Sequence, residues 1–94
     1  MKHYEMIVVF KPNLEEEVRK SGLERLYDAI NANGTVGEVD DWGQRKLAYE
    51  INYIKEGHYY LVNFEADPTI VKEVERRSHI QDNIIRYMVV SKEA

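Results

Sequence analysis

Four segments of the chain have the apolar pattern of β-strands, in which successive side chains point to opposite faces; the first is partly apolar on both faces, and in the second Leu47, Tyr49 and Ile51 alternate with period two. The segments cover residues 2–11, 35–51, 58–66 and 84–90. Only residues 53–57, which include a glycine, clearly interrupt the pattern between the second and third segments, so we predict that these two form a long hairpin. The sequence therefore predicts a sheet of four strands.

Between the first two strands, the apolar residues change to the spacing of an α-helix. Pro12 ends the strand, and Asn13 is a favourable N-cap for a helix that begins at Leu14. We expect Gly34 to end this helix. Gly22 lies on its apolar face, where glycine costs about 1 kcal/mol of helix propensity, so we expect close packing against the sheet there. The apolar face consists of Val18, Gly22, Leu23, Leu26, Ala29 and Ile30.

A second, shorter helix is predicted between the third strand and the fourth. Asp67 is a favourable N-cap, and Pro68 suits the first helical position, where its missing N–H is not needed. The helix should end near Arg76 and Arg77. Its apolar stripe consists of Ile70, Val71 and Val74.

The order strand, helix, strand, strand, helix, strand is that of a ferredoxin-like α+β sandwich (βαββαβ), in which two helices cover one face of a four-stranded antiparallel sheet. We expect residues 1–94 to form one such domain. The predicted core residues are Met6, Val8, Leu26, Ile30, Val62, Phe64 and Tyr87. The uncovered face, a candidate interaction surface, is predicted to carry Glu5, Ile7, Val9, Tyr59, Leu61, Asn63, Arg86 and Met88.

Composition narrows the class of protein. The chain has 94 residues, of which 44% are hydrophobic and 32% are charged, as expected for one globular domain. It has no apolar run approaching the ~20 residues of a membrane span and no signal peptide, so we expect a cytoplasmic protein without membrane contact. Because it has no cysteine, it forms neither disulfides nor thiolate metal sites.

The residues predict no catalytic centre. His3, His58 and His79 are scattered without the spacing of metal ligands, and we interpret them as surface or turn histidines. There is no glycine-rich phosphate loop and no nucleophile near a base, so we expect no enzyme, metal, cofactor or small-molecule substrate. Residues 56–63 also lack the basic first residue and the last aromatic residue with which RNA-recognition modules of this topology stack bases.

The stretch at residues 41–51 differs from its surroundings. It contains the only tryptophan, Trp42, followed by Gly43 and the adjacent cations Arg45 and Lys46. A glycine within a strand often marks a β-bulge, which re-aims the side chains that follow it. Taken alone, the stretch is equally consistent with an ordinary strand that has solvated charges and a tryptophan in the core.

The same stretch resembles a family signature. Residues 43–52 read GQRKLAYEIN, which is similar to the signature of bacterial small-subunit ribosomal protein six: glycine, any residue, basic, polar or basic, leucine, alanine, tyrosine, any residue, isoleucine. Residues 3–5, 11–13 and 82–86 also resemble the family, as do Gly57 and Tyr59, so the resemblance covers nearly the whole chain. Glu50 stands where the family often has proline, which leaves the strand a backbone N–H at that position.

The resemblance implies a structural component of the bacterial 30S subunit on the ribosome. It implies binding to the central domain of small-subunit (16S) ribosomal RNA together with a small basic partner, ribosomal protein eighteen of the same subunit. Carried over by position, the residues expected to contact this RNA or to fix that surface are Lys2, Tyr4, Arg45, Lys46, Lys55 and Arg86.

The net charge of −4 adds a constraint, because a polyanion repels an acidic chain at long range. We therefore expect strong RNA binding only with the cationic partner, docked on the border strand of the hairpin. The residues predicted for that docking are Glu38, Asp40, Asp41 and Trp42. Two alternatives stay open: the acids only protect an exposed strand edge from aggregation, or the chain is a stand-alone ferredoxin-like regulatory or small catalytic domain that acts as a homodimer.

Overall fold

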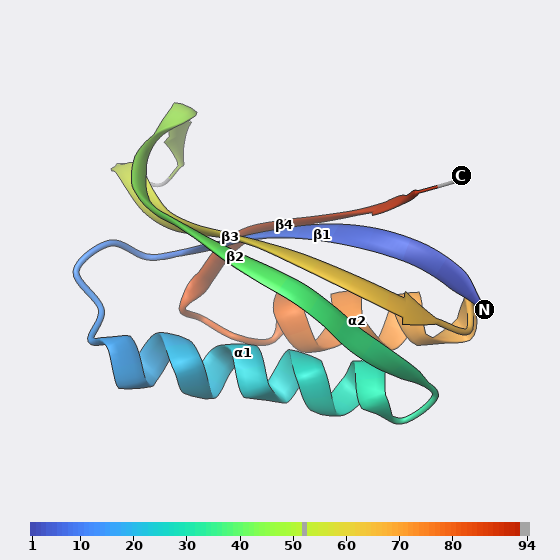
Figure 1. Cartoon of the computed structure of the whole chain (residues 1–94). Coiled ribbons are helices and arrows are strands. Elements are labelled where there is room, and N and C mark those ends of the chain that lie inside the picture. The colour runs from blue at the N-terminus through green and yellow to red at the C-terminus, as the bar shows by residue number, and fades with distance from the viewer. Residues whose placement is uncertain (52, 93–94) are drawn as a thin grey trace.

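The predicted elements occur in the predicted order in the structure, a computed structural model that describes residues 1–51 and 53–92. They are β1 (Lys2–Phe10), α1 (Glu16–Asn31), β2 (Gly34–Ile51), β3 (Ile54–Ala66), α2 (Thr69–His79) and β4 (Ile84–Ser91). The strands form one antiparallel sheet in the order β2-β3-β1-β4, and both helices lie on the same side of it (Figure 1). The prediction of a ferredoxin-like sandwich is confirmed.

The core lies between the sheet and the helices, and strand alternation decides which residues enter it. On β1 and β3 the even-numbered residues from Tyr4 and Tyr60 onward face the helices, because successive side chains point to opposite faces of a strand. Of the predicted core residues, all but Tyr87 are at most 3% exposed, and Tyr87 is half-buried against the core. The buried cluster consists of Tyr4, Met6, Val8, Phe10, Leu23, Leu26, Ala29, Ile30, Tyr60, Val62, Phe64, Ala66, Ile70, Val74 and Ile84.

The start of α1 differs from the prediction. The helix begins at Glu16 and not at Leu14, and no side chain caps its first turn. Asn13 has a φ of 65°, a left-handed conformation that asparagine adopts more readily than most residues. The predicted N-cap role of Asn13 is therefore wrong, because this residue turns the chain before the helix begins.

Gly34 also has a role other than the predicted one. α1 ends at Asn31 with Ala32 as its C-cap, and Gly34 is the first residue of β2. A Cβ atom at Gly34 would lie 2.6 Å from the Cβ of Ala66 and would also collide with the carbonyl oxygen of Glu65. Glycine is needed there because β2 and β3 approach closely, and not to end the helix.

Close packing at Gly22 is confirmed. A Cβ atom there would lie 2.7 Å from the Phe10 ring and 2.9 Å from Oε1 of Gln81. The Nε2 atom of Gln81 donates a hydrogen bond to the carbonyl oxygen of Gly22 at 3.2 Å. This glycine therefore lets α1, the sheet and the loop before β4 meet at one point.

α2 begins at Thr69 with Pro68 as its N-cap, so the predicted places of Asp67 as N-cap and of Pro68 as first helical residue are each wrong by one position. The backbone N–H of Thr69 donates to Oδ1 of Asp67 at 3.0 Å, and this bond, together with one from the Thr69 hydroxyl, lowers the pKa of the Asp67 carboxyl group. The helix continues to His79, slightly beyond the predicted end. Near that end, Nη1 of Arg77 donates to the carbonyl oxygen of Arg25 at 3.2 Å, which ties α2 to α1.

The hairpin of β2 and β3 is longer than the sequence predicts. β3 begins at Ile54, so most of the predicted turn at residues 53–57 pairs with β2 instead. The left-handed residue in the turn is Tyr53, with a φ of 68°, while Asn52 lies outside the described residues. A Cβ atom at Gly57 would collide with the side chain of Val9, so this glycine serves packing and not the turn.

Replacing Ile30 with alanine should destabilise the fold by about 2–5 kcal/mol, because this fully buried side chain would leave a cavity. Val18 is a matched control, since the sequence predicts it on the same helix face but it is 39% exposed. Val18→Ala should change the free energy of unfolding by only about 0.5 kcal/mol. Urea unfolding measures both, and an unchanged midpoint for Ile30→Ala would contradict the assigned helix face.

Candidate nucleic-acid interface

The end of the β2–β3 hairpin bends away from the helices, toward the side of the uncovered sheet face (Figure 1). Arg45, Lys46 and Lys55 lie on this part of the hairpin, and all three are exposed. Arg86 on β4 joins them, because its guanidinium carbon lies 5.9 Å from the centre of the Tyr49 ring on the hairpin. These predicted RNA-binding residues therefore gather at one end of the molecule.

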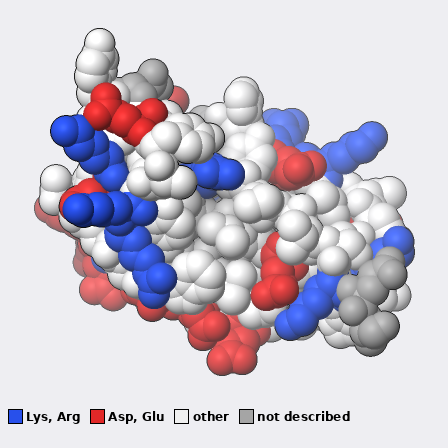
Figure 2. Space-filling model, turned by 90° about the horizontal axis from the view of Figure 1, so that it is seen from above, with Lys and Arg blue, Asp and Glu red and all other residues white. Residues whose placement is uncertain are grey.

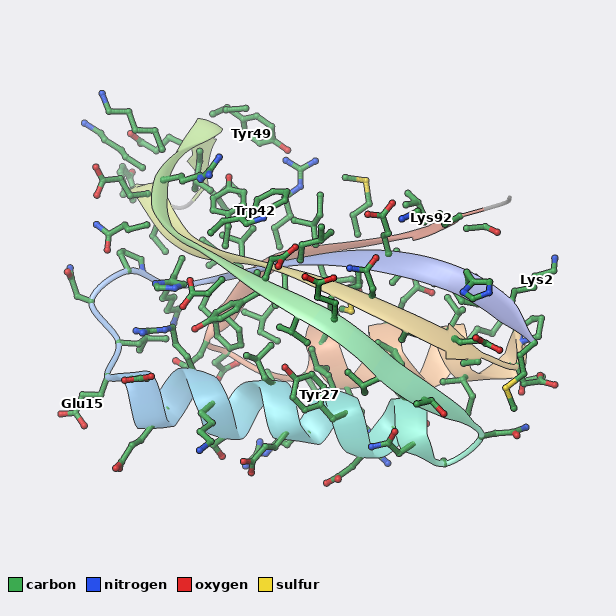
Figure 3. All side chains as sticks on the ribbon, in the orientation of Figure 1. Lys2, Glu15, Tyr27, Trp42, Tyr49 and Lys92 are labelled. Carbon is green, nitrogen blue, oxygen red and sulfur yellow. The ribbon has the colours of Figure 1, made fainter. Side chains whose placement is uncertain are left out.

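Lys2 and Tyr4 lie elsewhere. Lys2 is exposed and pairs with Ala66 at the end of the sheet far from Tyr49 (Figure 3). Tyr4 is only 7% exposed, and its ring stacks on Phe64 with 5.3 Å between the ring centres. Tyr4 is therefore a core residue, which leaves it a supporting role beneath the surface and no exposed ring for contact with RNA.

A β-bulge lies at the base of the hairpin end. The pairing of β2 with β3 shifts register between Asp41 and Gly43, and Gly43 has a φ of 75°. Glycine adopts this left-handed conformation without the steric cost that a side chain would add. The bulge that the sequence predicts at Gly43 is therefore confirmed.

Trp42 lies inside this bulge, and Arg45 packs against it. The guanidinium carbon of Arg45 lies 5.2 Å from the centre of the Trp42 ring, and its Nε donates to the Trp42 carbonyl oxygen at 3.3 Å. Because Trp42 is 36% exposed, its interpretation as a core tryptophan is wrong. The two contacts orient the Arg45 guanidinium, whose terminal N–H groups are donors of the kind that bind phosphate oxygens.

The acids predicted to bind a partner differ in their contacts. Oδ1 of Asp41 accepts a hydrogen bond from the Gly43 N–H at 2.8 Å and lies 2.6 Å from Nε2 of His58. Burial alone would raise the pKa of Asp41, but these hydrogen bonds outweigh it and lower the pKa below its ordinary value. Asp41 is thus engaged within the hairpin, whereas Glu38 and Asp40 lie beside it on β2, a border strand of the sheet.

Sequence reasoning missed the residues that support the bulge. His58, interpreted from the sequence as a surface or turn residue, lies within β3 and its side chain is only 16% exposed. Its ring stacks on Tyr60, whose hydroxyl accepts a hydrogen bond from Nε of Arg19 at 2.9 Å. The signal that could have identified His58 is the length of the hairpin. If β3 is taken to begin at Ile54, His58 pairs with Gln44 and lies next to the bulge.

The uncovered face of the sheet carries a mainly apolar hollow of about 230 Å³. Met88 and Val90 on its rim are 43% and 48% exposed, which agrees with the predicted apolar surface. Val9 is an exception at 1% exposed, because the hairpin packs over it at Gly57. The hollow is lined by Glu5, Ile7, Trp42, Leu61, Met88 and Val90.

Charged side chains are distributed unevenly over the molecule. Seen from the side of the uncovered face, Lys and Arg side chains gather beside acidic ones at the hairpin end on the left, further Lys and Arg side chains lie on the right, and the middle of the face is mostly uncharged (Figure 2). α1, on the other side of the sheet, begins with Glu16 and Glu17 and has no basic residue in its last turn. A polyanion is therefore attracted to the hairpin end more strongly than to the start of α1.

Other kinds of site find little support in the structure. Among residues 1–51 and 53–92, no group of three His, Asp or Glu side chains is arranged to hold a metal ion. None of the described helices is long and apolar enough to cross a membrane. Every buried side-chain nitrogen or oxygen atom of the described residues has a hydrogen-bond partner, so no orphaned polar atom indicates a ligand site.

Comparison with known sequences agrees with the resemblance found in the hairpin. Residues 3–91 match the family model described as Ribosomal protein S6. The chain is 47% identical over 90 residues to small ribosomal subunit protein bS6 of Alkaliphilus oremlandii, with 96% of each chain covered. It is 49% identical over 94 residues to the protein of that name from Clostridium perfringens, with 99% of each chain covered.

A solved structure is also similar. The crystal structure of 30S ribosomal protein S6 from Thermotoga maritima matches with a TM-score of 0.88 and 31% identity, covering 97% of this chain and 87% of that one. The relatives are ribosomal proteins and not enzymes, which excludes the alternative of a small catalytic domain. With a family match over residues 3–91 and relatives of nearly equal length, this chain belongs to the ribosomal protein S6 family of the bacterial small subunit.

Proposed function

We propose that this chain is a structural component of the bacterial 30S subunit that binds the central domain of 16S ribosomal RNA together with ribosomal protein eighteen. The observation that carries the proposal is the cluster of Arg45, Lys46, Lys55 and Arg86 at the hairpin end. As a small-subunit ribosomal protein, the chain works in the cytoplasmic ribosome.

The hairpin end suits contact with phosphates better than readout of bases. Arg45 and Lys46 are neighbours on a strand, so their side chains point to opposite faces and do not converge on one base. Arg86 reaches the same end from β4, where it contacts Tyr49. Cations that point in several directions can contact successive phosphates along a curved RNA backbone. Contacts with phosphates position a protein on RNA but do not read its base sequence.

A cationic partner supplies what the acidic chain lacks. With a net charge of −4, the chain has few cations of its own for phosphates, and a strongly basic protein adds more while neutralising the acids. Glu38, Asp40 and the exposed ring of Trp42 lie along β2, whose outer edge offers unpaired backbone groups for a strand of the partner. The competing role of these acids is to protect that edge from aggregation.

Lys46→Ala should weaken RNA binding by a similar factor for different loop sequences, because a phosphate contact carries no base preference. Removing one phosphate contact should reduce the slope of log K against log salt concentration by about one unit. Lys72→Ala on α2 removes the same charge from a helix on the other side of the sheet and should leave the slope unchanged. An unchanged slope with altered sequence preference for Lys46→Ala would contradict the phosphate assignment.

Filter binding of central-domain 16S RNA should show much tighter binding by this chain with ribosomal protein eighteen than by this chain alone, at one fixed salt concentration. The double replacement Glu38→Lys and Asp40→Lys should remove most of that gain, because it repels the basic partner. Asp41 is left intact because its carboxylate holds the bulge.

A matched replacement on α1, Glu24→Lys with Asp28→Lys, changes the net charge equally and should keep the gain. Equal RNA affinity with and without the partner would contradict the heterodimer. If the partner still increases RNA affinity fully after Glu38 and Asp40 are replaced by lysine, these acids do not bind the partner, and their role is to protect the strand edge from aggregation.

A further inference from the structure

One carboxylate oxygen holds the bulge closed. Oδ1 of Asp41 accepts the N–H of Gly43 at 2.8 Å, which bridges the bulge within β2, and lies 2.6 Å from Nε2 of His58, which ties the bulge to β3. Hydrogen bonds to an ionised acceptor are stronger than those between neutral groups. The same oxygen therefore restricts both the backbone of the bulge and its position on the neighbouring strand.

The bulge in turn determines where Arg45 lies. Trp42 is the residue between Asp41 and Gly43, and Arg45 contacts it twice, through its carbonyl oxygen at 3.3 Å and through its ring at 5.2 Å. Both contacts depend on the backbone conformation at Trp42, which changes if the bulge opens. A path of direct contacts therefore links the Asp41 carboxylate to the Arg45 guanidinium.

His58 is itself held in place from the side of the helices. Its ring stacks on Tyr60 with 4.9 Å between the ring centres and an angle of 27° between the planes. Nε of Arg19 on α1 donates to the Tyr60 hydroxyl at 2.9 Å, and Nη1 of the same arginine donates to the carbonyl oxygen of Leu14. The bulge is thus connected to α1 through His58, Tyr60 and Arg19.

We propose that Asp41 and His58 are positioning residues that lock the bulge at Gly43 and thereby present Arg45 to a phosphate group of the RNA in one orientation. This inference rests on the proposed RNA-binding function and adds a role that the sequence did not predict. It assigns the Asp41 carboxylate to hydrogen bonds with other residues of the hairpin and not to contact with the partner protein.

The first test uses the chain without RNA. Trp42 is the only tryptophan, so its fluorescence reports on the bulge alone. Asp41→Ala and His58→Phe should both shift its emission to longer wavelength, because the ring loses Arg45 and becomes more accessible to water. His58→Phe keeps an aromatic ring beside Tyr60 but removes the donor. Asp41→Asn keeps a hydrogen-bond acceptor at position 41, and His58→Gln keeps a donor at position 58. Both variants should therefore have the same Trp42 emission wavelength as the original chain.

Asp40→Ala is the control for charge in the fluorescence test. Asp40 precedes Asp41 on the same strand, and no side-chain hydrogen bond of Asp40 is present among the described residues. This variant should leave the emission unchanged. Unchanged emission in both Asp41→Ala and His58→Phe would overturn the proposed lock, and so would an equal shift in Asp40→Ala.

The second test is a double-mutant cycle for RNA binding by the chain with its basic partner. Arg45→Ala should weaken binding and reduce the salt slope by about one unit. Asp41→Ala should cause a similar loss when Arg45 is present and little further loss when Arg45 is alanine, because it acts through that residue. Equal losses by Asp41→Ala in both backgrounds would overturn the positioning role, since Asp41 would then act directly.

The two tests separate this inference from the proposed function. Binding by Arg45→Ala at full affinity would overturn the role of Arg45 on RNA, and with it the presentation of Arg45 to a phosphate. The emission of Trp42 would still decide whether Asp41 and His58 lock the bulge. A third outcome is a shift of Trp42 emission together with additive losses of RNA affinity for the Asp41 and Arg45 variants. The bulge would then be locked, but the lock would not act through Arg45, which contradicts the proposal.

Discussion

The helices cover only one side of the sheet, and this one-sided coverage determines which residues are buried and which part of the hairpin projects. Two helices bury one face, so each strand contributes every second residue to a single core, and the other face stays open. β2 and β3 span 18 and 13 residues, whereas β1 and β4 span 9 and 8. The end of the longer pair therefore extends beyond the layer that the helices cover, and its residues do not have to be apolar.

That overhang carries three cations, Arg45, Lys46 and Lys55. α1 begins with Glu16 and Glu17, and the basic side chains of the hairpin end are visible from the side of the uncovered face (Figure 2). An overhanging hairpin without core contacts needs another means to keep its shape. The bulge at Gly43, held by Asp41 and His58 and connected through Tyr60 to Arg19, supplies that rigidity from polar contacts.

Much of the fold can be predicted from the sequence because burial of one face requires apolar residues at regular spacing along each strand and helix. The alternation of β1 and β3 and the apolar face of α1 predict the core, with Val18 the exception at the edge of that face. The sequence also predicts the roles of Gly22 and Gly43, since a glycine on a buried helix face or within a strand often marks close packing or a bulge. The family resemblance, and not the periodicity, identified the hairpin cations.

The remaining features depend on contacts between segments that are distant in the sequence. Gly34 and Gly57 look like turn residues, yet their neighbours on adjacent strands exclude a side chain. Asn13 looks like a cap, yet its left-handed φ belongs to the turn before the helix. The partnership of Asp41 with His58, 17 residues apart, appears only when the hairpin register is known.

Cleavage of ribosomal RNA from a probe tethered to this chain measures whether the hairpin end faces that RNA. The chain has no cysteine, so a single cysteine can carry an iron chelate that releases hydroxyl radicals. The sites compared are Ala48 at the exposed hairpin end and Glu24 on the exposed side of α1. In assembled small subunits, we expect strong cleavage of central-domain 16S RNA from Ala48→Cys and weak cleavage from Glu24→Cys. Strong cleavage from Glu24→Cys with none from Ala48→Cys would contradict this expectation.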